Sequence, residues 1–294
     1  MKSIVILSGK GGVGKSSIAA SLAVALSWGK KIVCADCDVD ASNLSLLFSV
    51  TEKEYEGWKP LSTNQAAVVD RSRCTGCGVC ERTCYFDAVH LKESYAEVDD
   101  LGCEGCGACE LACPENAISM VNIENANVGY ARTGYGFYIA SAQMMPGSSG
   151  SGKVVAEVRK KTAEIARDAE YVLIDAAAGI GCPVIASVTG NNLAIIVAEP
   201  TPAGFADMKK AFETVEHFKI KAGIIINKYN LNKEYTDKII NFAKDKKIKI
   251  FKRIGFDRNF VNAMVKMQPI ISLDAKYKAM FEDIKNQVLS ELQD

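Results

Sequence analysis

The sequence predicts an α/β fold, a doubly wound and mostly parallel sheet that is interrupted once by a smaller α+β module. Three observations predict this fold. Short runs of β-branched residues alternate with segments of helical periodicity over most of the 294 residues. A glycine-rich loop directly follows the first of these runs. The alternation stops in a cysteine-rich stretch and then resumes.

The first elements follow the order strand, glycine loop, helix, strand. Residues 3–8, SIVILS, are apolar and rich in β-branched side chains, which predicts a strand. Residues 17–28 repeat apolar side chains at helical spacing until Gly29 ends the pattern. A second strand is expected at 31–36, KIVCAD. This order is typical of the beginning of a doubly wound domain.

The later elements complete the same domain after the interruption. Within the cysteine-rich stretch, the short apolar runs at 66–69 and 88–91 suit small strands. We therefore assign residues 1–57 and 123–294 to one discontinuous α/β domain and residues 58–122 to the inserted module. In the resumed part, helices are expected at 153–169, 204–218, 233–245 and 277–292, and strands at 171–175, 192–199, 222–227 and 247–254.

The composition is that of a globular protein. Hydrophobic residues make up 48% of the chain, and Lys plus Arg equal Asp plus Glu at 35 each. A net charge of zero gives no general reason to expect a nucleic acid or an anionic membrane as partner. No run of about eighteen apolar residues could span a bilayer, and Gly9 follows Lys2 too closely for a secretory signal. We expect a cytoplasmic protein without a membrane span or a nucleic-acid partner.

Eleven cysteines in such a protein indicate metal ligation rather than disulfides. A reducing compartment disfavours structural disulfides, and an odd number of cysteines cannot close completely into pairs. Eight of the cysteines lie in two cassettes, CTGCGVCERTC and CEGCGACELAC, which share the spacing C-x₂-C-x₂-C-x₃-C. Every cysteine of the first cassette recurs 29 positions later in the second. The duplication predicts two pseudo-symmetric sites.

The cassette spacing is typical of bacterial ferredoxins, in which three close cysteines bind one [4Fe–4S] cluster and the fourth reaches the other cluster. One cluster is therefore assigned Cys74, Cys77, Cys80 and Cys113, and the other Cys103, Cys106, Cys109 and Cys84. Zinc is the alternative metal, but zinc sites usually pair two C-x₂-C units at longer separation and often include histidine. Pro114 follows the second cassette as the ferredoxin motif expects, whereas Tyr85 follows the first, where its ring could cover the cluster.

The glycine loop fits the phosphate-binding pattern G-x-x-x-x-G-K-[ST], between a predicted strand and a predicted helix. Its glycines allow backbone N–H groups to surround phosphate oxygens, and the helix dipole favours the negative charge. Lys15 is expected to bridge the terminal phosphates, and the Ser16 hydroxyl to hold Mg²⁺. A glycine-rich turn without a ligand is the alternative. The predicted binding residues are Gly9, Lys10, Gly11, Gly12, Val13, Gly14, Lys15, Ser16 and Ser17.

A second lysine follows the first glycine, and GKGGVGKS resembles the deviant Walker A loop of the MinD/ParA/nitrogenase-iron-protein class of P-loop ATPases. In that class the extra lysine, here Lys10, reaches across a dimer to the nucleotide of the other subunit. The resemblance therefore implies an ATP-dependent homodimer in which Lys10 and Lys15 stabilise charge on the transferred phosphoryl group. An ordinary solvated loop lysine is the alternative for Lys10.

The same resemblance implies roles for four further residues. DCDVDASNL stands where the class has its first switch, so Asp38 is implied to position or activate the attacking water, and Asp36 to lie near the Mg²⁺ shell. YVLIDAAAGIG resembles a Walker B segment in which Asp175 supports Mg²⁺ indirectly. Asn227 stands where relatives bind the adenine amino group, which implies ATP rather than GTP. Ala176–Ala178 replace prolines that relatives often carry, which leaves this switch less constrained.

Three cysteines lie outside the cassettes. We expect Cys34 and Cys37 to be structural. Cys182 lies seven residues after Asp175, in GIGCPVIAS. The nitrogenase iron protein has a cluster-ligating cysteine at a similar offset on its dimer interface, so the resemblance leaves a subunit-bridging cluster open. A packed cysteine is the alternative, because one Cys182 per subunit is short of the four thiolates that a cluster needs.

Over nearly its whole length the chain resembles MinD-superfamily P-loop ATPases with an inserted bacterial-type 2[4Fe–4S] ferredoxin domain. The resemblance implies ATP/ADP, Mg²⁺ and two [4Fe–4S] clusters as cofactors. The first hypothesis is a homodimeric ATPase that couples nucleotide-driven movement to electron transfer, with a protein electron donor or acceptor as partner. The second is an iron–sulfur scaffold or carrier that serves an apo-metalloprotein client. The third is a positioning ATPase that uses the clusters as redox sensors.

The last predicted helix disfavours a membrane-bound form of the third hypothesis. MinD-type proteins bind membrane through a basic amphipathic C-terminal helix, whereas FEDIKNQVLSELQD carries four acidic residues and one lysine. Anionic lipid would repel such a helix, so membrane association is not expected.

Overall fold

The computed structural model describes residues 1–293, which divide into two compact units. The first unit comprises Met1–Trp58, Val128–Gln143 and the chain from Ser151 onward. The second comprises Lys59–Asn127 and Met144–Gly150, compared with the 58–122 that the sequence pattern predicts for an inserted module. Each unit has its own sheet structure and its own buried cluster of side chains.

A nine-stranded sheet forms the first unit, in the order β13-β12-β11-β1-β10-β2-β9-β8-β3. All neighbouring strands from β13 to β9 pair in parallel, which confirms the predicted doubly wound α/β fold. The strands are β1 (Lys2–Ser8), β2 (Ile32–Cys37), β3 (Glu56–Leu61), β8 (Ala126–Arg132), β9 (Tyr138–Met144), β10 (Tyr171–Ala178), β11 (Leu193–Ala198), β12 (Lys221–Asn227) and β13 (Lys249–Ile254).

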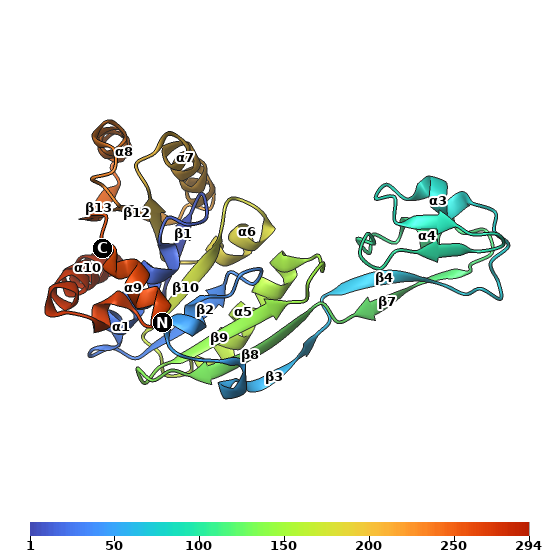
Figure 1. Cartoon of the computed structure of the whole chain (residues 1–294), viewed down its shortest axis with the longest axis horizontal. Helices are drawn as coiled ribbons and strands as arrows, with labels where there is room; N and C mark the ends of the chain where they lie inside the picture. Colours follow the sequence, from blue (N-terminus) through green and yellow to red (C-terminus); the bar gives the residue numbers. More distant parts are fainter. Residues whose placement is uncertain (294) are drawn as a thin grey trace. The chain divides into compact units, whose positions relative to one another are not determined.

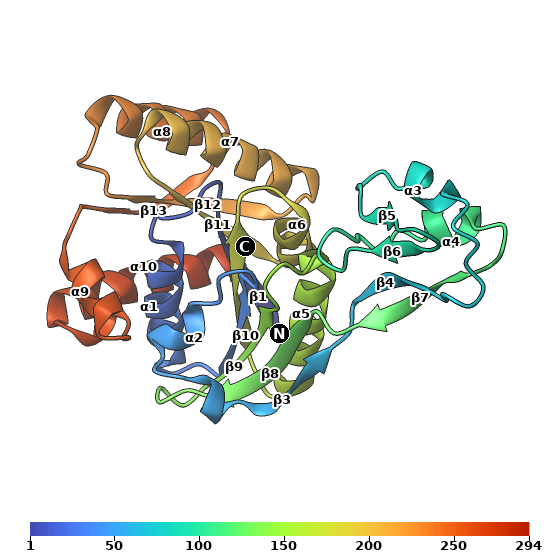
Figure 2. The same ribbon diagram turned by 45° about the vertical axis from the view of Figure 1, so that its right-hand side comes forward.

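Helices cover both faces of this sheet (Figures 1 and 2). Helices α1 and α10 pack together on one face, and α5, α6, α7 and α8 lie on the other. The helices are α1 (Lys15–Ser27), α2 (Leu44–Leu47), α5 (Ser151–Ile165), α6 (Cys182–Val188), α7 (Pro202–His217), α8 (Lys233–Asp245), α9 (Asn259–Val265) and α10 (Ala275–Gln293), with 3₁₀ turns at Glu52–Glu54 and Ile270–Ser272. None of the helices in residues 1–293 is both long and apolar enough to cross a bilayer.

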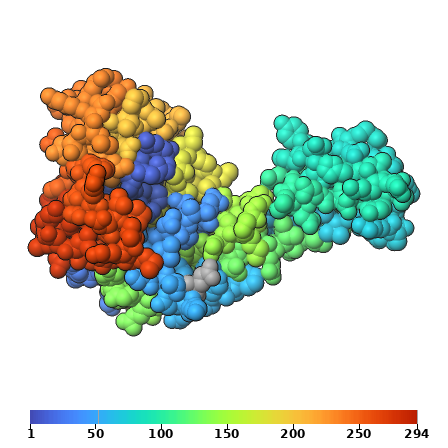
Figure 3. Space-filling view, in the orientation of Figure 1, coloured from blue at the N-terminus to red at the C-terminus, as the bar shows by residue number. Residues whose placement is uncertain are grey.

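The central strands are apolar along their whole length because both of their faces are covered. Every side chain from Ile4 to Leu7 in β1 is fully buried. Ile4 and Ile6 join the core cluster beneath α1 and α10, so the alternate side chains of β1 face the opposite layer. In the space-filling view, the N-terminal segment (dark blue) reaches the surface of the first unit between the α7–α8 region (gold to orange) and the C-terminal residues (red) (Figure 3).

The second unit contains two small antiparallel sheets and two short helices. Its elements are β4 (Asn64–Val69) with β7 (Ile118–Ile123), β5 (Val89–Leu91) with β6 (Ala96–Val98), α3 (Val79–Thr83) and α4 (Ala108–Ala112). Gly78 and Gly107 directly precede α3 and α4, and their φ angles of 70° and 75° are in the left-handed region that glycine tolerates. The two glycines are 29 residues apart, so the cassette repeat is also a repeat of backbone conformation.

The contact between β12 and β13 gives a test of the packing of the first sheet. A Cβ atom added to Gly223 would lie 2.0 Å from Cε2 of Phe251, whose side chain is 2% exposed. Gly223→Ala is therefore expected to lower the free energy of unfolding by roughly 1–3 kcal/mol through overpacking. Urea denaturation followed by circular dichroism would measure the loss.

The matched control adds Phe251→Leu to Gly223→Ala. The smaller side chain vacates the space that the new methyl group needs, so part of the lost stability should return relative to the sum of the two single changes. Strict additivity of the two losses would contradict this account of the contact.

Candidate functional site

The phosphate-binding motif lies where the first strand passes into the first helix. Residues 9–14 form the loop between β1 and α1, and Gly14 precedes the helix with φ 93°. Lys15, Ser16 and Ser17 form the first turn of α1. Strands β1, β10 and β2 are neighbours, so the carboxyl ends of these strands meet beside the loop.

Lys15 is the centre of a buried charged cluster at this edge of the sheet. Its side chain is 6% exposed, and its Nζ donates to Oδ1 of Asp175 at 2.7 Å. Oδ2 of Asp38 lies 3.6 Å from the same Nζ, and the Ser16 hydroxyl lies at 3.4 Å. The structure therefore brings together four of the residues that the sequence singled out, from the first turn of α1, from β10 and from the segment after β2.

Burial and charge shift the pKa of three groups in this cluster. Burial alone would lower the pKa of Lys15, but Asp175 and Asp38 reverse this effect and raise it. Burial, and then the charge of Asp175, raise the pKa of Asp36 to about 7. Burial also raises the pKa of Asp38, although the ammonium of Lys15 opposes this shift. The cluster thus has more carboxylates than cations, which favours the uptake of a cation or a proton.

Asp36 holds the segment that follows β2. Its carboxylate accepts hydrogen bonds from the Ser42 hydroxyl at 2.8 Å and from the backbone N–H groups of Leu44 at 2.9 Å and Asp38 at 3.2 Å. The Ser42 hydroxyl in turn lies 2.7 Å from that of Ser141 in β9. Asp36 is therefore placed to position the Asp38 segment in addition to lying next to Asp175 in the sheet register.

Asp175 carries an unsatisfied oxygen that suits the predicted Mg²⁺. The residue is fully buried, and its Oδ2 has no hydrogen-bond partner within residues 1–293. A buried carboxylate oxygen without a partner is costly, and magnesium prefers oxygen ligands and keeps several waters. Asp175 and Ser16 would hold a hydrated Mg²⁺, which would satisfy this oxygen, so the donor set fits the ion.

Lys10 pairs with Glu199, a residue that the sequence analysis missed. Lys10 Nζ lies 3.0 Å from Oε1 of Glu199, and Lys228 Nζ lies 2.6 Å from the other oxygen. Lys228 also donates to the carbonyl of Gly12 at 3.1 Å. Although burial opposes the shift, hydrogen bonds from Lys228 and Lys10 lower the pKa of Glu199. Since Glu199 directly follows β11, its place at a strand end of an α/β sheet was a signal for this role.

Asn227 ends β12 beneath the same loop. It is buried, and its Nδ2 donates to the carbonyl of Val13 at 2.7 Å. Its Oδ1 accepts the backbone N–H of Lys228 at 3.0 Å. In this structure the amide therefore anchors the phosphate-binding loop.

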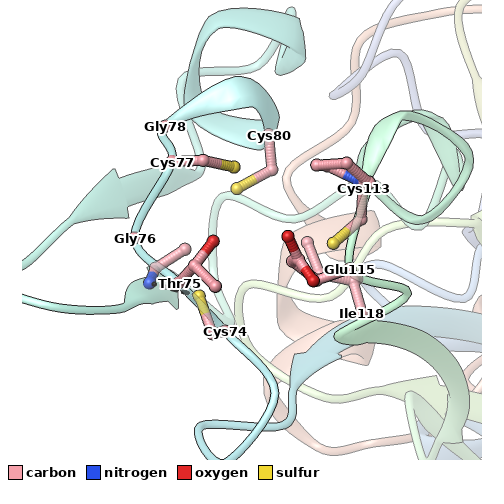
Figure 4. A pocket seen from close by; sticks show the side chains of 11 residues that line it. Cys74, Thr75, Gly76, Cys77, Gly78, Cys80, Cys113, Glu115 and Ile118 are labelled. Carbon is pink, nitrogen blue, oxygen red and sulfur yellow. Dashed lines mark hydrogen bonds between the residues drawn. The ribbon is translucent and has the colours of Figure 1, made fainter.

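The second unit gathers its cysteines into two cavities. One cavity is lined by Cys74, Cys77 and Cys80 of the first cassette and by Cys113 of the second. Figure 4 shows the sulfur atoms of these four residues turned toward one space. The other cavity is lined by Cys103, Cys106, Cys109 and Cys84. We name them cavity 1 and cavity 2.

Backbone N–H groups are directed at three of the cysteine sulfurs. Ala117 donates to Sγ of Cys113 and Ala88 to Sγ of Cys84, both at 3.3 Å, and Ala96 donates to Sγ of Cys74 at 3.4 Å. Such donors stabilise thiolates that are bound to a metal. No group of three or more His, Cys, Asp or Glu side chains in residues 1–293 is arranged to hold a single metal ion.

The expectation that the ring of Tyr85 covers a cluster is wrong. Tyr85 does not line cavity 2; its side chain is 92% exposed, and the neighbouring Phe86 lines the cavity instead.

The three cysteines outside the cassettes differ in burial. Cys34 and Cys37 are buried in β2, and burial raises the pKa of the Cys37 thiol to about 12. Cys182 is exposed at the first position of α6.

The shifted pKa of Asp36 predicts a pH dependence of stability. Between its ordinary value of 3.8 and about 7, the folded chain keeps a proton on Asp36 that the unfolded chain has released. The free energy of unfolding contributed by this residue should therefore fall as the pH rises through this window, by up to about 1.4 kcal/mol per pH unit. Above pH 8 the contribution should be constant.

Urea denaturation from pH 5 to 8.5, without nucleotide or Mg²⁺, would measure this effect as the difference between the wild type and Asp36→Asn. Asp168→Asn, at an exposed position of the same unit, is the control and should leave the pH profile unchanged. Parallel profiles of the wild type and Asp36→Asn would contradict the shift.

Comparison with known proteins agrees with this site. Residues 4–270 match the family model described as the CobQ/CobB/MinD/ParA nucleotide binding domain. An uncharacterized protein of Methanocaldococcus jannaschii is 36% identical over 256 residues, which cover 86% of this chain and 84% of that protein. The iron-sulfur cluster carrier protein of the same organism is 23% identical, with 99% of this chain and 84% of that protein covered.

Among solved structures, the septum site-determining protein MinD of Pyrococcus horikoshii, complexed with Mg-ADP, has the same fold. The TM-score is 0.60 at 18% identity, and 98% of this chain and 95% of that chain are covered. The match of residues 4–270 to a nucleotide-binding family agrees with the phosphate-binding loop, and the shared fold agrees with the parallel sheet. The chain belongs to the CobQ/CobB/MinD/ParA family of nucleotide-binding P-loop proteins.

Proposed function

We propose that this protein is a homodimeric, Mg²⁺-dependent ATPase that controls electron transfer to a partner protein through two [4Fe–4S] clusters. The observation that carries the proposal is the presence, in one chain, of a P-loop site and of two cavities that are each lined by four cysteines. The first unit supplies the nucleotide site, and the second unit is the proposed 2[4Fe–4S] ferredoxin module.

The cysteine cavities support the assignment of clusters. Each cavity takes three cysteines from one cassette and the last cysteine from the other, which is the ligand pattern of two-cluster ferredoxins. When bound, the clusters would supply one-electron carriers at low potential. The chain's own contribution is to bury Cys80 and Cys109, and to direct backbone N–H groups at Cys74, Cys84 and Cys113. Cys77 and Cys106 are exposed, and the burial and hydrogen bonding of the other ligands favour clusters that stay in place.

The charged cluster supports the proposed nucleotide chemistry. Lys15 would exchange its ion pair with Asp175 for the terminal phosphates, and Asp175 would then support hydrated Mg²⁺ with Ser16. Asp38, 3.6 Å from the Lys15 ammonium, would orient the attacking water. Lys10 would leave Glu199 and reach the nucleotide of a second subunit, where its charge stabilises the transferred phosphoryl group. Asn227, beneath the loop, is the proposed adenine contact.

The order of the chain supports coupling between the two functions. Asp36 holds the segment from Asp38 to Leu44, which leads through α2 and β3 directly into the second unit at Lys59. A nucleotide that changes the charge around Asp36 would therefore act on the segment that enters the cysteine-rich unit.

A cluster-carrier function is the second candidate. It is favoured by the 23% identity to an iron-sulfur cluster carrier protein over 99% of the chain, and by the exposure of Cys182. The distinguishing result is ATP-dependent transfer of iron and sulfide to an apo-ferredoxin acceptor. Retention of the clusters through repeated ATP turnover would favour the electron-transfer function.

Paired cysteine substitutions test the assignment of the two clusters. Anaerobically purified wild type should contain about eight irons per chain. Cys77→Ala with Cys113→Ala removes two ligands from cavity 1 alone, so about four irons should remain. Cys77→Ala with Cys84→Ala removes one ligand from each cavity, so both clusters should be lost or labile. Iron and sulfide analysis with EPR of the reduced protein would measure this.

The two double variants are matched controls, because each removes Cys77 and the last cysteine of one cassette. If each cassette instead bound its own cluster, the results of the two variants would be exchanged. Stoichiometric zinc in place of iron after anaerobic purification would overturn the cluster assignment itself.

Substitution of Lys10 tests the proposed dimeric ATPase. Lys10→Ala should still bind MgATP, because Lys15 and the loop remain, but ATP hydrolysis should fall by roughly a hundredfold or more. The ATP-dependent dimer should also be lost. Nucleotide binding by calorimetry, phosphate release and light scattering would measure the three properties.

Lys31→Ala, at an exposed lysine of the same unit, is the control and should behave as the wild type. In the wild type, MgATP should change the EPR spectrum or midpoint potential of the clusters, and in Lys10→Ala it should not. A spectrum that is insensitive to MgATP in the wild type would contradict nucleotide control, and full hydrolysis by Lys10→Ala would contradict the role of Lys10.

A further inference from the structure

The two cysteine cavities have the same backbone framework. Asp70 donates its backbone N–H to the carbonyl of Ala117 at 2.7 Å, and Asp99, 29 residues later, donates to the carbonyl of Ala88 at 2.8 Å. The carbonyls of Asp70 and Asp99 then accept the N–H groups of Cys74 and Cys103 at 3.1 Å and 3.0 Å. Because the framework repeats so closely, a difference between the two rims is a difference of side chains at equivalent positions.

The loop before the first cysteine differs in charge between the two rims. Beside cavity 1 it is Arg71-Ser72-Arg73, and at the equivalent positions beside cavity 2 it is Asp100-Leu101-Gly102. The residue directly after the first cysteine of each cassette also differs. It is Thr75, which lines cavity 1, in the first cassette and Glu104, which lines cavity 2, in the second. The loop that leads into cavity 1 is therefore basic, although Arg71 pairs with Glu97 at 3.7 Å, and the loop that leads into cavity 2 is acidic.

The segment after the last cysteine differs in apolar surface. Pro114 and Glu115 line cavity 1, whereas the equivalent residues of cavity 2 are Tyr85 and Phe86. The two aromatic rings contact each other edge to face at 5.5 Å, with Tyr85 92% and Phe86 44% exposed. The turn has the same unusual backbone in both copies, since Asp87 and Asn116 have φ angles of 53° and 45°. Only cavity 2 therefore has an exposed aromatic pair at its edge.

The wider charge distribution extends this difference. Residues 59–127 contain eleven Asp and Glu and five Lys and Arg, a net charge of −6, although the whole chain is neutral. All five basic residues lie before residue 93, and residues 93–127 contain eight acidic residues and no Lys or Arg. Asp99, Asp100 and Glu104 beside cavity 2 are all exposed. Phe86 of the aromatic pair and the carboxylate of Glu104 line the same cavity, and the basic residue nearest to the pair in the sequence is Arg82.

We propose that the surface around cavity 2 is the docking surface for the electron-exchange partner. It comprises Phe86 and Glu104, which line the cavity, and their sequence neighbours Tyr85, Asp100 and Leu101, which are exposed. The occupant is a one-electron carrier protein whose own face has an apolar centre surrounded by lysines and arginines. Exposed aromatic side chains are the residues that most often dominate binding energy at protein interfaces, and complementary charges raise the rate of encounter. The proposal rests on the proposed function, because it takes the four cysteines of cavity 2 as cluster ligands.

The test uses the full chain, purified anaerobically, and ferric cytochrome c as a small basic haem protein of the proposed chemistry. Binding is measured at low ionic strength by surface plasmon resonance. Glu104→Lys should weaken binding roughly tenfold, because it places a cation on the docking rim. Glu115→Lys makes the same charge change at the rim of cavity 1 and should alter binding by less than about twofold. Tyr85→Ala should weaken binding roughly fivefold to tenfold.

A second measurement locates the bound probe. Zero-length carbodiimide cross-links between cytochrome c lysines and this chain, mapped by mass spectrometry, should fall on Asp100 and Glu104. Raising the salt concentration should weaken wild-type binding and reduce the difference between wild type and Glu104→Lys. Glu104→Gln, with a smaller charge change, should give an intermediate affinity.

Equal weakening by Glu104→Lys and Glu115→Lys would overturn the proposal, as would cross-links at the rim of cavity 1. Self-association of the nucleotide-free wild type that is lost in Tyr85→Ala would also overturn it, because the occupant would then be a second copy of this chain. Iron content is measured on every variant, so a chain without iron would contradict the proposed function independently of the binding result.

Discussion

The nucleotide-binding unit depends on one buried charge, the ammonium of Lys15. An isolated ammonium in this position would be strongly destabilising, and here it is compensated by Asp175 at 2.7 Å and Asp38 at 3.6 Å. The parallel pairing of β1, β10 and β2 is what brings these partners together, because all three strands end at the same edge. With Asp36 also buried beside Asp175, the cluster has excess negative charge and an oxygen without a partner. A divalent cation would neutralise the excess carboxylate charge, and a phosphate would pair with the ammonium of Lys15.

The cysteine-rich unit is constrained differently, because it has little apolar material. Its core consists of six buried residues, two of which, Cys80 and Cys109, are proposed ligands. Four more cassette cysteines pack against this core: Cys74, Cys84, Cys103 and Cys113. A small unit of this kind usually needs covalent or metal cross-links to be stable. In the proposed function the ligands therefore also form the core, which links the folding of the unit to cluster binding.

The sequence predicted those parts of the structure that depend on local pattern. The strand–loop–helix around Gly9–Ser16 and helix α8 at Lys233–Asp245 follow from periodicity and glycine placement. It did not predict β8 and β9, because GYARTGYGFYIAS mixes glycines with aromatics, and its strand character comes from pairing across the sheet. Glu199 was missed because its contacts with Lys10 and Lys228 join residues far apart in the chain. Periodicity also could not determine that Phe86, rather than Tyr85, lines cavity 2.

The two lysines of the phosphate-binding loop differ in how easily they can move. The Lys10–Glu199 pair is partly open to solvent, with side chains 31% and 11% exposed, so its contribution to stability is about 1 kcal/mol or less. Glu199 also keeps Lys228 as a partner when Lys10 leaves, so no buried charge is left alone. Lys15 has no such freedom, since breaking a buried pair without replacement costs about 3–5 kcal/mol. In the proposed function, phosphate would therefore have to reach Lys15 as Asp175 releases it, whereas Lys10 could exchange partners at little cost. In the proposed function, this difference suits Lys15 to binding the nucleotide of its own subunit and Lys10 to reaching the nucleotide of a second subunit.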